Sequence, residues 1–171
     1  VILNLSASDE VAGKAAYRRQ LVSGQSARLL CGYVYADAGQ GESSTDMVFA
    51  GHNMIAENGA LLAENRFSTG LTATELDVGR LVYERRRMTT FSGDTENVWR
   101  QSFSLKDTET ALTRPVSPAP FVPQGQRDRA ERCDEILRIA ALGLKQRLEH
   151  THAAAAVIGL SGGLDSTLAI L

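Results

Sequence analysis

Apolar and polar positions follow one another along the chain in runs that predict an α/β fold. Residues 1–5 are mostly apolar, which is typical of a strand buried on both faces. A polar loop with helix-capping residues follows, and four-residue steps from Tyr17 then predict a helix that begins near Lys14. Gly24 weakens the second half of this helix, so its end is expected either there or near Leu30.

A series of short strands is predicted for the next part of the chain. Strands are expected over residues 31–36, 47–50, 54–57, 60–63 and 74–78. The dipeptide Asn58-Gly59 between two apolar runs is the strongest short signal for a hairpin, and His52 is expected in an exposed turn before it. A charged helix over residues 79–87 is predicted to follow the last strand.

All four prolines lie between residues 114 and 123, a composition that favours extended backbone and resists helix and sheet. We therefore place a linker over residues 106–123. A helix over residues 126–150 is predicted after it, from apolar residues that share one face: Ala130, Cys133, Leu137, Ala140, Ala141, Leu144 and Leu148. A buried strand over residues 154–160 and the start of another helix are expected to complete the chain.

Charge and composition narrow the function classes. The 171 residues carry 18 Lys and Arg against 20 Asp and Glu, so no basic field exists to bind nucleic acid. No apolar run approaches the roughly 20 residues of a membrane span, and the first residues do not resemble a signal peptide. Two cysteines far apart in sequence favour a reducing, cytoplasmic setting over a disulfide framework. The chain opens within a strand pattern and closes just inside a helix pattern, so we expect it to be an internal part of a longer protein.

Residues 161–166, with the sequence SGGLDS, lie between a predicted strand and a predicted helix. Such a turn exposes backbone N–H groups, its glycines let a phosphate approach closely, and the helix N-terminus favours negative charge. The alternative is an ordinary glycine turn with Asp165 as the helix cap. The string resembles the PP-loop of ATP pyrophosphatases. That resemblance implies ATP contacts from Ser161, Gly162, Gly163, Leu164, Asp165 and Ser166. Asp165 would either support Mg²⁺ or order the loop.

Three strings before and after the linker carry a more specific resemblance: NLSASDEVAGKAAYRR, QSARLLCGYVYADAGQGESSTDMVFAGHNMIAENGALLAENRF, and RDRAERCDEIL running into SGGLDS. They resemble glutamine-dependent NAD⁺ synthetases, which fuse a nitrilase-like glutaminase domain to a PP-loop domain. The implied fold is α/β: the C-terminal half of a nitrilase-like α-β-β-α sandwich, followed by the start of a Rossmann-like PP-loop domain. The implied domains are residues 1–105 and 124–171, on either side of the linker.

The resemblance implies a ligase that makes NAD⁺ from deamido-NAD⁺ and ATP with ammonia released from glutamine, forming AMP and pyrophosphate. ATP and Mg²⁺ would be substrate and metal, with no tightly bound cofactor. The Glu, Lys and Cys of the glutaminase are expected upstream of Val1, so the isolated chain is expected to be inactive. The complete protein is expected to form a homo-oligomer and to bind neither nucleic acid nor membranes.

The same resemblance implies that Ser8 and Lys14 contact the bound glutamine, since a cation and a hydroxyl donor suit amino-acid recognition. The alternative is a capping Ser and a solvated Lys. Cys31 and Cys133 are interpreted as core residues, not nucleophiles. The polar segment 42–46 is interpreted as a structural loop, and the basic cluster of Arg80, Arg85, Arg86 and Arg87 as a solvated helix face or an oligomer contact.

Two other functions fit the sequence. One is an amidotransferase with the same pair of domains that adenylates a different substrate, and the other is a non-catalytic nitrilase-like scaffold. Residues after Leu171 would distinguish the first, and an upstream Cys replaced by another residue would favour the second.

Overall fold

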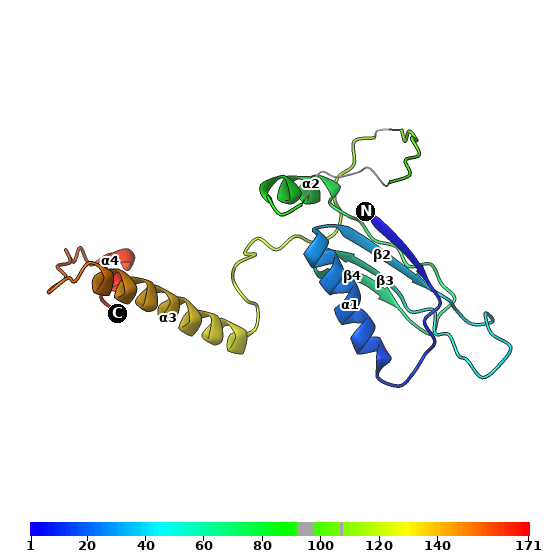
Figure 1. Cartoon of the computed structure of the whole chain (residues 1–171), viewed down its shortest axis with the longest axis horizontal. Helices are drawn as coiled ribbons and strands as arrows, with labels where there is room; N and C mark the ends of the chain where they lie inside the picture. Colours follow the sequence, from blue (N-terminus) through cyan, green and yellow to red (C-terminus); the bar gives the residue numbers. More distant parts are fainter. Residues whose placement is uncertain (92–97, 107) are drawn as a thin grey trace. The chain divides into compact units, whose positions relative to one another are not determined.

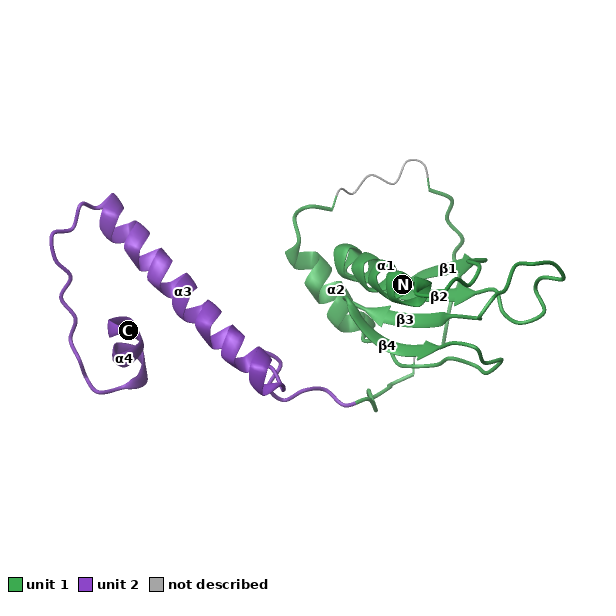
Figure 2. Cartoon of the chain, turned by 90° about the horizontal axis from the view of Figure 1, so that it is seen from below, with its two compact units in different colours: residues 1–114 green, residues 115–171 purple. Residues whose placement is uncertain are grey.

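The computed structural model describes residues 1–91, 98–106 and 108–171. The chain divides into two compact units, Val1–Arg114 and Pro115–Leu171, which are coloured separately in Figure 2. The division falls within the 106–123 segment that the prolines single out. The assignment of the two parts to enzyme domains stays a prediction.

A four-stranded mixed sheet forms the centre of unit 1 (Figure 1). Its order is β1 (Ile2–Ser6), β2 (Gly32–Asp37), β3 (Asn53–Glu57) and β4 (Ala60–Asn65). The β1–β2 pair is parallel and the other two pairs are antiparallel. A parallel pair needs a crossover connection, and helix α1 (Lys14–Leu29) provides it. The predicted α/β class is therefore confirmed, and its nitrilase-like detail stays a prediction.

Helix α1 covers one face of the sheet, as Figures 1 and 2 both show. The core is a cluster of Val22 from the helix with Tyr35, Met54 and Ala56 from the strands. Residues of β1 alternate between half-buried and exposed, so the prediction that this strand is buried on both faces is wrong. Leu3 is 74% exposed because it points away from α1 on the first strand of the sheet.

The hairpin between β3 and β4 turns at Asn58 and Gly59, as the sequence predicts. Both residues have positive φ, 45° and 89°, which this kind of tight turn requires. The predicted strand over 47–50 is wrong. The backbone carbonyl of Val48 accepts from the N–H of Glu10 at 2.6 Å, so this segment bonds to the loop before α1 and not to a strand.

Helix α2 spans Val78–Arg87, close to the predicted bounds. The strand predicted over 74–78 is wrong, because Asp77 caps this helix: its Oδ1 accepts from the N–H of Arg80 at 2.8 Å. Leu76 instead packs against the sheet beside Gly32, where a Cβ would come within 2.7 Å of its Cδ1.

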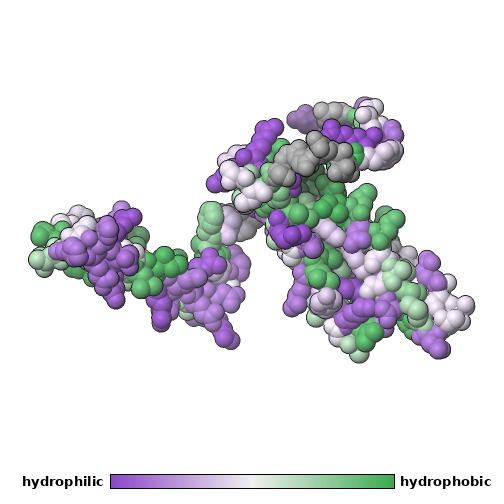
Figure 3. Space-filling view, in the orientation of Figure 1, coloured by the Kyte–Doolittle hydropathy of each residue, from purple (hydrophilic) through white to green (hydrophobic). Residues whose placement is uncertain are grey.

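Unit 2 contains α3 (Gln126–His150) and α4 (Leu164–Ile170). The bounds of α3 match the prediction, but none of its residues is buried, so the prediction that Cys133 is a core residue is wrong. The strand predicted over 154–160 is also wrong. Val157 is 99% exposed, and a strand forms only where another strand accepts its backbone hydrogen bonds. Apolar surface is accordingly visible in both units (Figure 3).

In the part of the chain that the structure describes, no helix combines the length and the apolar character needed to cross a bilayer.

Candidate functional site in the loop before helix α1

The loop between β1 and α1 carries both residues proposed to recognise glutamine. Ser8 follows the end of β1, and Lys14 is the first residue of α1. The backbone N–H of Ser8 donates to Oδ1 of Asp37 at 2.8 Å, which ties the loop to the end of the neighbouring strand β2. Because β1 and β2 are parallel, their carboxyl ends meet at this edge, where loops of α/β folds commonly form sites.

Lys14 and Ser8 have different partners. The Nζ atom of Lys14 lies 2.6 Å from Oδ1 of Asp9 and 2.8 Å from its carbonyl oxygen. The hydrogen bond and charge of Lys14 hold the pKa of Asp9 below its usual value. The side chain of Lys14 is 28% exposed, so a ligand carboxylate could reach it by displacing Asp9.

Arg18 was missed by the sequence analysis, and it is the centre of this region. Its side chain is only 4% exposed. Nε donates to Oγ of Ser8 at 3.2 Å, and Nη1 pairs with Oε2 of Glu10 at 2.8 Å. Oδ2 of Asp37 lies 3.9 Å from Nε, is buried, and has no hydrogen-bond partner among the described residues. A sequence signal for a buried Arg18 was the clustering of opposite charges in NLSASDEVAGKAAYRR, because a buried arginine requires several acceptors.

His52 is fully buried, so the prediction of an exposed turn residue is wrong. Its ring lies between Nη1 of Arg18, 3.1 Å from Nδ1, and Oε1 of Glu64, 2.6 Å from Nε2. These partners come from α1 and β4, far from His52 in sequence, and they satisfy both ring nitrogens without water.

The carboxylates of Glu10 and Glu64 pair with the arginines around His52. Burial by itself raises the pKa of Glu10, but hydrogen bonds from Arg18 and Arg66 outweigh it and hold that pKa below its usual value. Burial acts on Glu64 in the same way, and hydrogen bonds from His52 and Arg19 lower its pKa overall. Both carboxylates are therefore ionised at neutral pH, so the charges around Arg18 are fixed by paired, ionised side chains.

Cys31 lies away from this loop, between the end of α1 and the start of β2, and is 6% exposed. Burial raises the pKa of its thiol, which disfavours the thiolate that a nucleophile needs. The prediction that it packs as a core residue is therefore confirmed.

Residues 161–163 form a turn that leads into α4, and residues 164–166 are the first residues of that helix. Gly162 has φ +80°, which favours glycine, and Gly163 precedes the first helical residue. Oγ of Ser166 donates to the carbonyl of Gly163 at 3.1 Å, and Oγ of Ser161 accepts from the N–H of Gly163 at 3.3 Å. Asp165 is exposed in the first turn of α4.

The residues of the other predicted features do not join either region. Residues 42–46 lie in a largely exposed loop outside any helix or strand. Arg85 on α2 donates to the carbonyl of Leu29, at the end of α1, and its guanidinium lies 4.3 Å from the ring centre of Phe91. Among the described residues, no group of three or more His, Cys, Asp or Glu side chains is placed to hold a metal ion.

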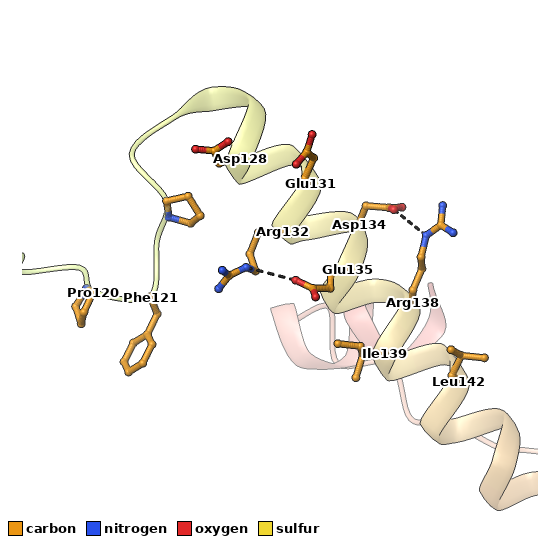
Figure 4. Close-up of a pocket in the computed structure, with 11 residues that line it drawn as sticks. Pro120, Phe121, Asp128, Glu131, Arg132, Asp134, Glu135, Arg138, Ile139 and Leu142 are labelled. Carbon is orange, nitrogen blue, oxygen red and sulfur yellow. Dashed lines mark hydrogen bonds and ion pairs between the residues drawn. The ribbon is translucent and has the colours of Figure 1, made fainter. Parts of the chain in front are cut away.

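A surface hollow lies within unit 2, between linker residues Pro120 and Phe121 and the first half of α3 (Figure 4). Two of its carboxylates are paired with arginines on the same helix: Asp134 lies 2.7 Å from Arg138, and Glu135 lies 3.5 Å from Arg132.

Comparison with known proteins identifies what the chain resembles. No protein-family model matches it. Over an alignment of 183 residues that includes all of this chain, it is 43% identical to a glutamine-dependent NAD⁺ synthetase of Mycobacterium tuberculosis and 41% identical to one of Mycobacterium leprae. A solved glutamine-dependent NAD⁺ synthetase from Cytophaga hutchinsonii is 38% identical over 42% of this chain and 13% of that one, with a TM-score of 0.37.

The class that these relatives define is that of the glutamine-dependent synthetases. These curated relatives are NAD⁺ synthetases, so the resemblance stated from the sequence is confirmed. The chain spans 27% of the length of these curated relatives.

Proposed function

We propose that this chain is part of a glutamine-dependent NAD⁺ synthetase. The observation that carries the proposal is the 43% identity, which extends over both units and not over one domain alone. The complete protein is then a ligase that converts deamido-NAD⁺, ATP and glutamine into NAD⁺, AMP, pyrophosphate and glutamate. It acts in the cytoplasm as a homo-oligomer.

Unit 1 contributes to glutamine hydrolysis in this proposal, as the C-terminal part of a nitrilase-like domain. A Cys thiolate outside the chain attacks the side-chain amide carbon, ammonia leaves, and water hydrolyses the thioester to glutamate. Residues of this chain bind and orient the substrate. The partly exposed side chain of Lys14 pairs with the α-carboxylate of glutamine in place of Asp9, and the hydroxyl of Ser8 donates a hydrogen bond to it.

Unit 2 contributes the start of the PP-loop domain. The turn formed by residues 161–166 presents backbone N–H groups and two hydroxyls to the pyrophosphate part of ATP. The carboxylate of deamido-NAD⁺ attacks the α-phosphorus, pyrophosphate leaves, and ammonia then displaces AMP from the acyl adenylate. Contacts to ATP come from Ser161, Gly162, Gly163, Leu164, Asp165 and Ser166.

Asp165 fits a role in holding Mg²⁺ with ATP. Asp165 is an exposed residue in the first turn of α4, and Mg²⁺ is usually held by one or two carboxylates together with substrate phosphates. When bound, the ion supplies charge neutralisation to the phosphates.

Asp165→Ala in the complete protein tests this function. We expect NAD⁺ formation from deamido-NAD⁺, ATP and glutamine to fall by two orders of magnitude or more, roughly the loss seen when a phosphate-stabilising group is removed. Glutamate release, measured in parallel, should persist. Asp134→Ala is the matched control, because Asp134 lies on exposed α3 and, among the described residues, pairs with Arg138. Absence of NAD⁺ formation by the unaltered protein, or an unaffected Asp165→Ala variant, would contradict the proposal.

A further inference from the structure

The loop over residues 7–13 is tied to the sheet by the backbone N–H of Ser8 and to the 47–50 segment by that of Glu10, and the side chain of Arg18 adds contacts to three of its residues. It ends at Gly13, which has φ +85° and gives α1 no side-chain cap. Arg18 lies one turn further along α1 and reaches back to the loop. The loop that carries Ser8 is therefore oriented in part by Arg18, whose side chain is only 4% exposed.

Arg18 contacts three consecutive loop residues with separate donors. Nε donates to Oγ of Ser8 at 3.2 Å, Nη2 donates to the carbonyl of Asp9 at 2.8 Å, and Nη1 donates to Oε2 of Glu10 at 2.8 Å. A guanidinium is planar with fixed donor directions, so three such contacts determine both the position and the twist of the loop.

The guanidinium is fixed from its other side as well. His52 accepts from Nη1 at 3.1 Å and is joined through Nε2 to Glu64 at 2.6 Å. Because the His52 side chain is fully buried, rotation of Arg18 would leave buried polar groups without partners, which costs roughly 1–3 kcal/mol for each group. A chain of hydrogen bonds therefore leads from Glu64 on β4 through His52 and Arg18 to the loop.

We propose that Arg18 is the positioning residue for glutamine recognition, and that it acts by orienting the hydroxyl group of Ser8. A serine hydroxyl has one proton and accepts through its lone pairs. Since Oγ of Ser8 accepts from Nε of Arg18, its own proton is directed away from Arg18 and is available to an acceptor oxygen of the substrate. Arg18 also donates from Nη2 to the carbonyl of Asp9. This second hydrogen bond positions Asp9, whose carboxylate pairs with Lys14. This inference rests on the proposed function and extends it to a residue that does not touch the substrate.

Arg18→Lys in the complete protein is the first test. Lysine keeps the charge beside Glu10 but cannot reach Ser8, Asp9 and His52 together. We expect the KM for glutamine to rise by about tenfold or more, the loss of one charge-assisted hydrogen bond, while the kcat of glutamine hydrolysis changes by less than about threefold. Arg28→Lys is the matched control, because Arg28 is exposed on the same helix and its side chain bonds to Gln25 within the described part of the chain.

Ser8→Ala and the double variant show whether Arg18 acts through Ser8. If it does, the two substitutions share one effect, and their combined change in KM is smaller than the product of the separate changes. If Arg18→Lys does not fold, Ser8→Ala alone carries the test, because it leaves the buried charges in place and must still raise the KM for glutamine.

Three outcomes would overturn the proposal: a KM within about twofold of the unaltered protein, a kcat that falls as much as KM rises, or full multiplicativity in the double variant. These are distinct from failure of the proposed function, in which the unaltered protein itself does not hydrolyse glutamine.

Discussion

Arg18 donates a hydrogen bond from Nη1 to Nδ1 of His52 across 3.1 Å, and this contact fixes the protonation of the imidazole. A guanidinium has donors only, so Nδ1 must accept and carries no proton. The proton is then on Nε2, which donates to Oε1 of Glu64 at 2.6 Å. His52 thus joins α1 to β4 through a buried chain of hydrogen bonds.

Replacement of His52 by Leu is expected to destabilise unit 1. The leucine side chain cannot accept from Nη1 of Arg18 or donate to Oε1 of Glu64, so both groups lose a hydrogen-bond partner. We therefore expect the free energy of unfolding to fall by about 1–3 kcal/mol. Urea unfolding of the purified chain measures this change. His150→Leu is the control, because His150 lies at the exposed end of α3 and should leave the unfolding of unit 1 unchanged. Equal stability of the His52 and His150 variants would contradict a structural role for the imidazole.

Acid should weaken the same region through Glu10. Its pKa in the folded chain is lower than the value of 4.5 expected without its partners, so folding favours the ionised form. The corresponding stability is present above about pH 4.5 and is lost as the pH falls through the folded-state pKa. We expect the urea midpoint to decrease below pH 4.5, and Glu10→Gln to reduce this decrease. Glu42→Gln, in the exposed loop, should retain it. A midpoint that does not change in acid would show that the pairs with Arg18 and Arg66 contribute nothing to folding.

The sequence predicts the regular elements of this chain better than its buried polar contacts. Helix α3 has the predicted bounds Gln126–His150, and the Asn58-Gly59 turn is where a local signal places it, because helix periodicity and turn chemistry depend on neighbouring residues. The segments 47–50 and 74–78 are apolar enough for strands. In the folded chain, however, the carbonyl of Val48 accepts from Glu10 in the loop before α1, and Leu76 packs beside Gly32.

The candidate site shows the same limit. The sequence alone places Ser8 in the loop after β1 and Lys14 at the start of α1, whereas Arg18 and His52 are brought together from positions 34 residues apart. A histidine in a glycine-flanked turn has the local pattern of an exposed residue. Its burial depends on acceptor and donor groups from α1 and β4, which no local pattern reveals.

Glu57 is expected to hold the end of unit 1 against the sheet. This side chain is 3% exposed; it accepts from the N–H of Asp77 at 2.6 Å and pairs with Arg114 at 2.7 Å. Glu57→Ala leaves Arg114 without its carboxylate partner, so we expect a loss of about 3 kcal/mol in unfolding free energy and faster hydrogen exchange at the first amides of α2. Glu84→Ala, which removes only a surface pair with Arg87, is the control. Unchanged exchange in the Glu57 variant would show that α2 is held by other contacts.

Two glycines in unit 1 should respond to alanine in opposite directions. Gly59 has φ +89°, and a Cβ there would lie 3.0 Å from Cβ of Ala27 on α1, so both backbone strain and crowding oppose a side chain. We expect Gly59→Ala to cost about 1–3 kcal/mol of unfolding free energy.

Gly24 lies inside α1, where a Cβ meets nothing within 4 Å. Alanine has the higher helix propensity, so we expect Gly24→Ala to stabilise the chain by about 0.5–1 kcal/mol. Thermal and urea unfolding of the two variants measured side by side make each the control for the other. A stabilising Gly59→Ala would mean that the β3–β4 turn does not require positive φ at that position, and a destabilising Gly24→Ala would mean that α1 does not continue through residue 24 to Leu29.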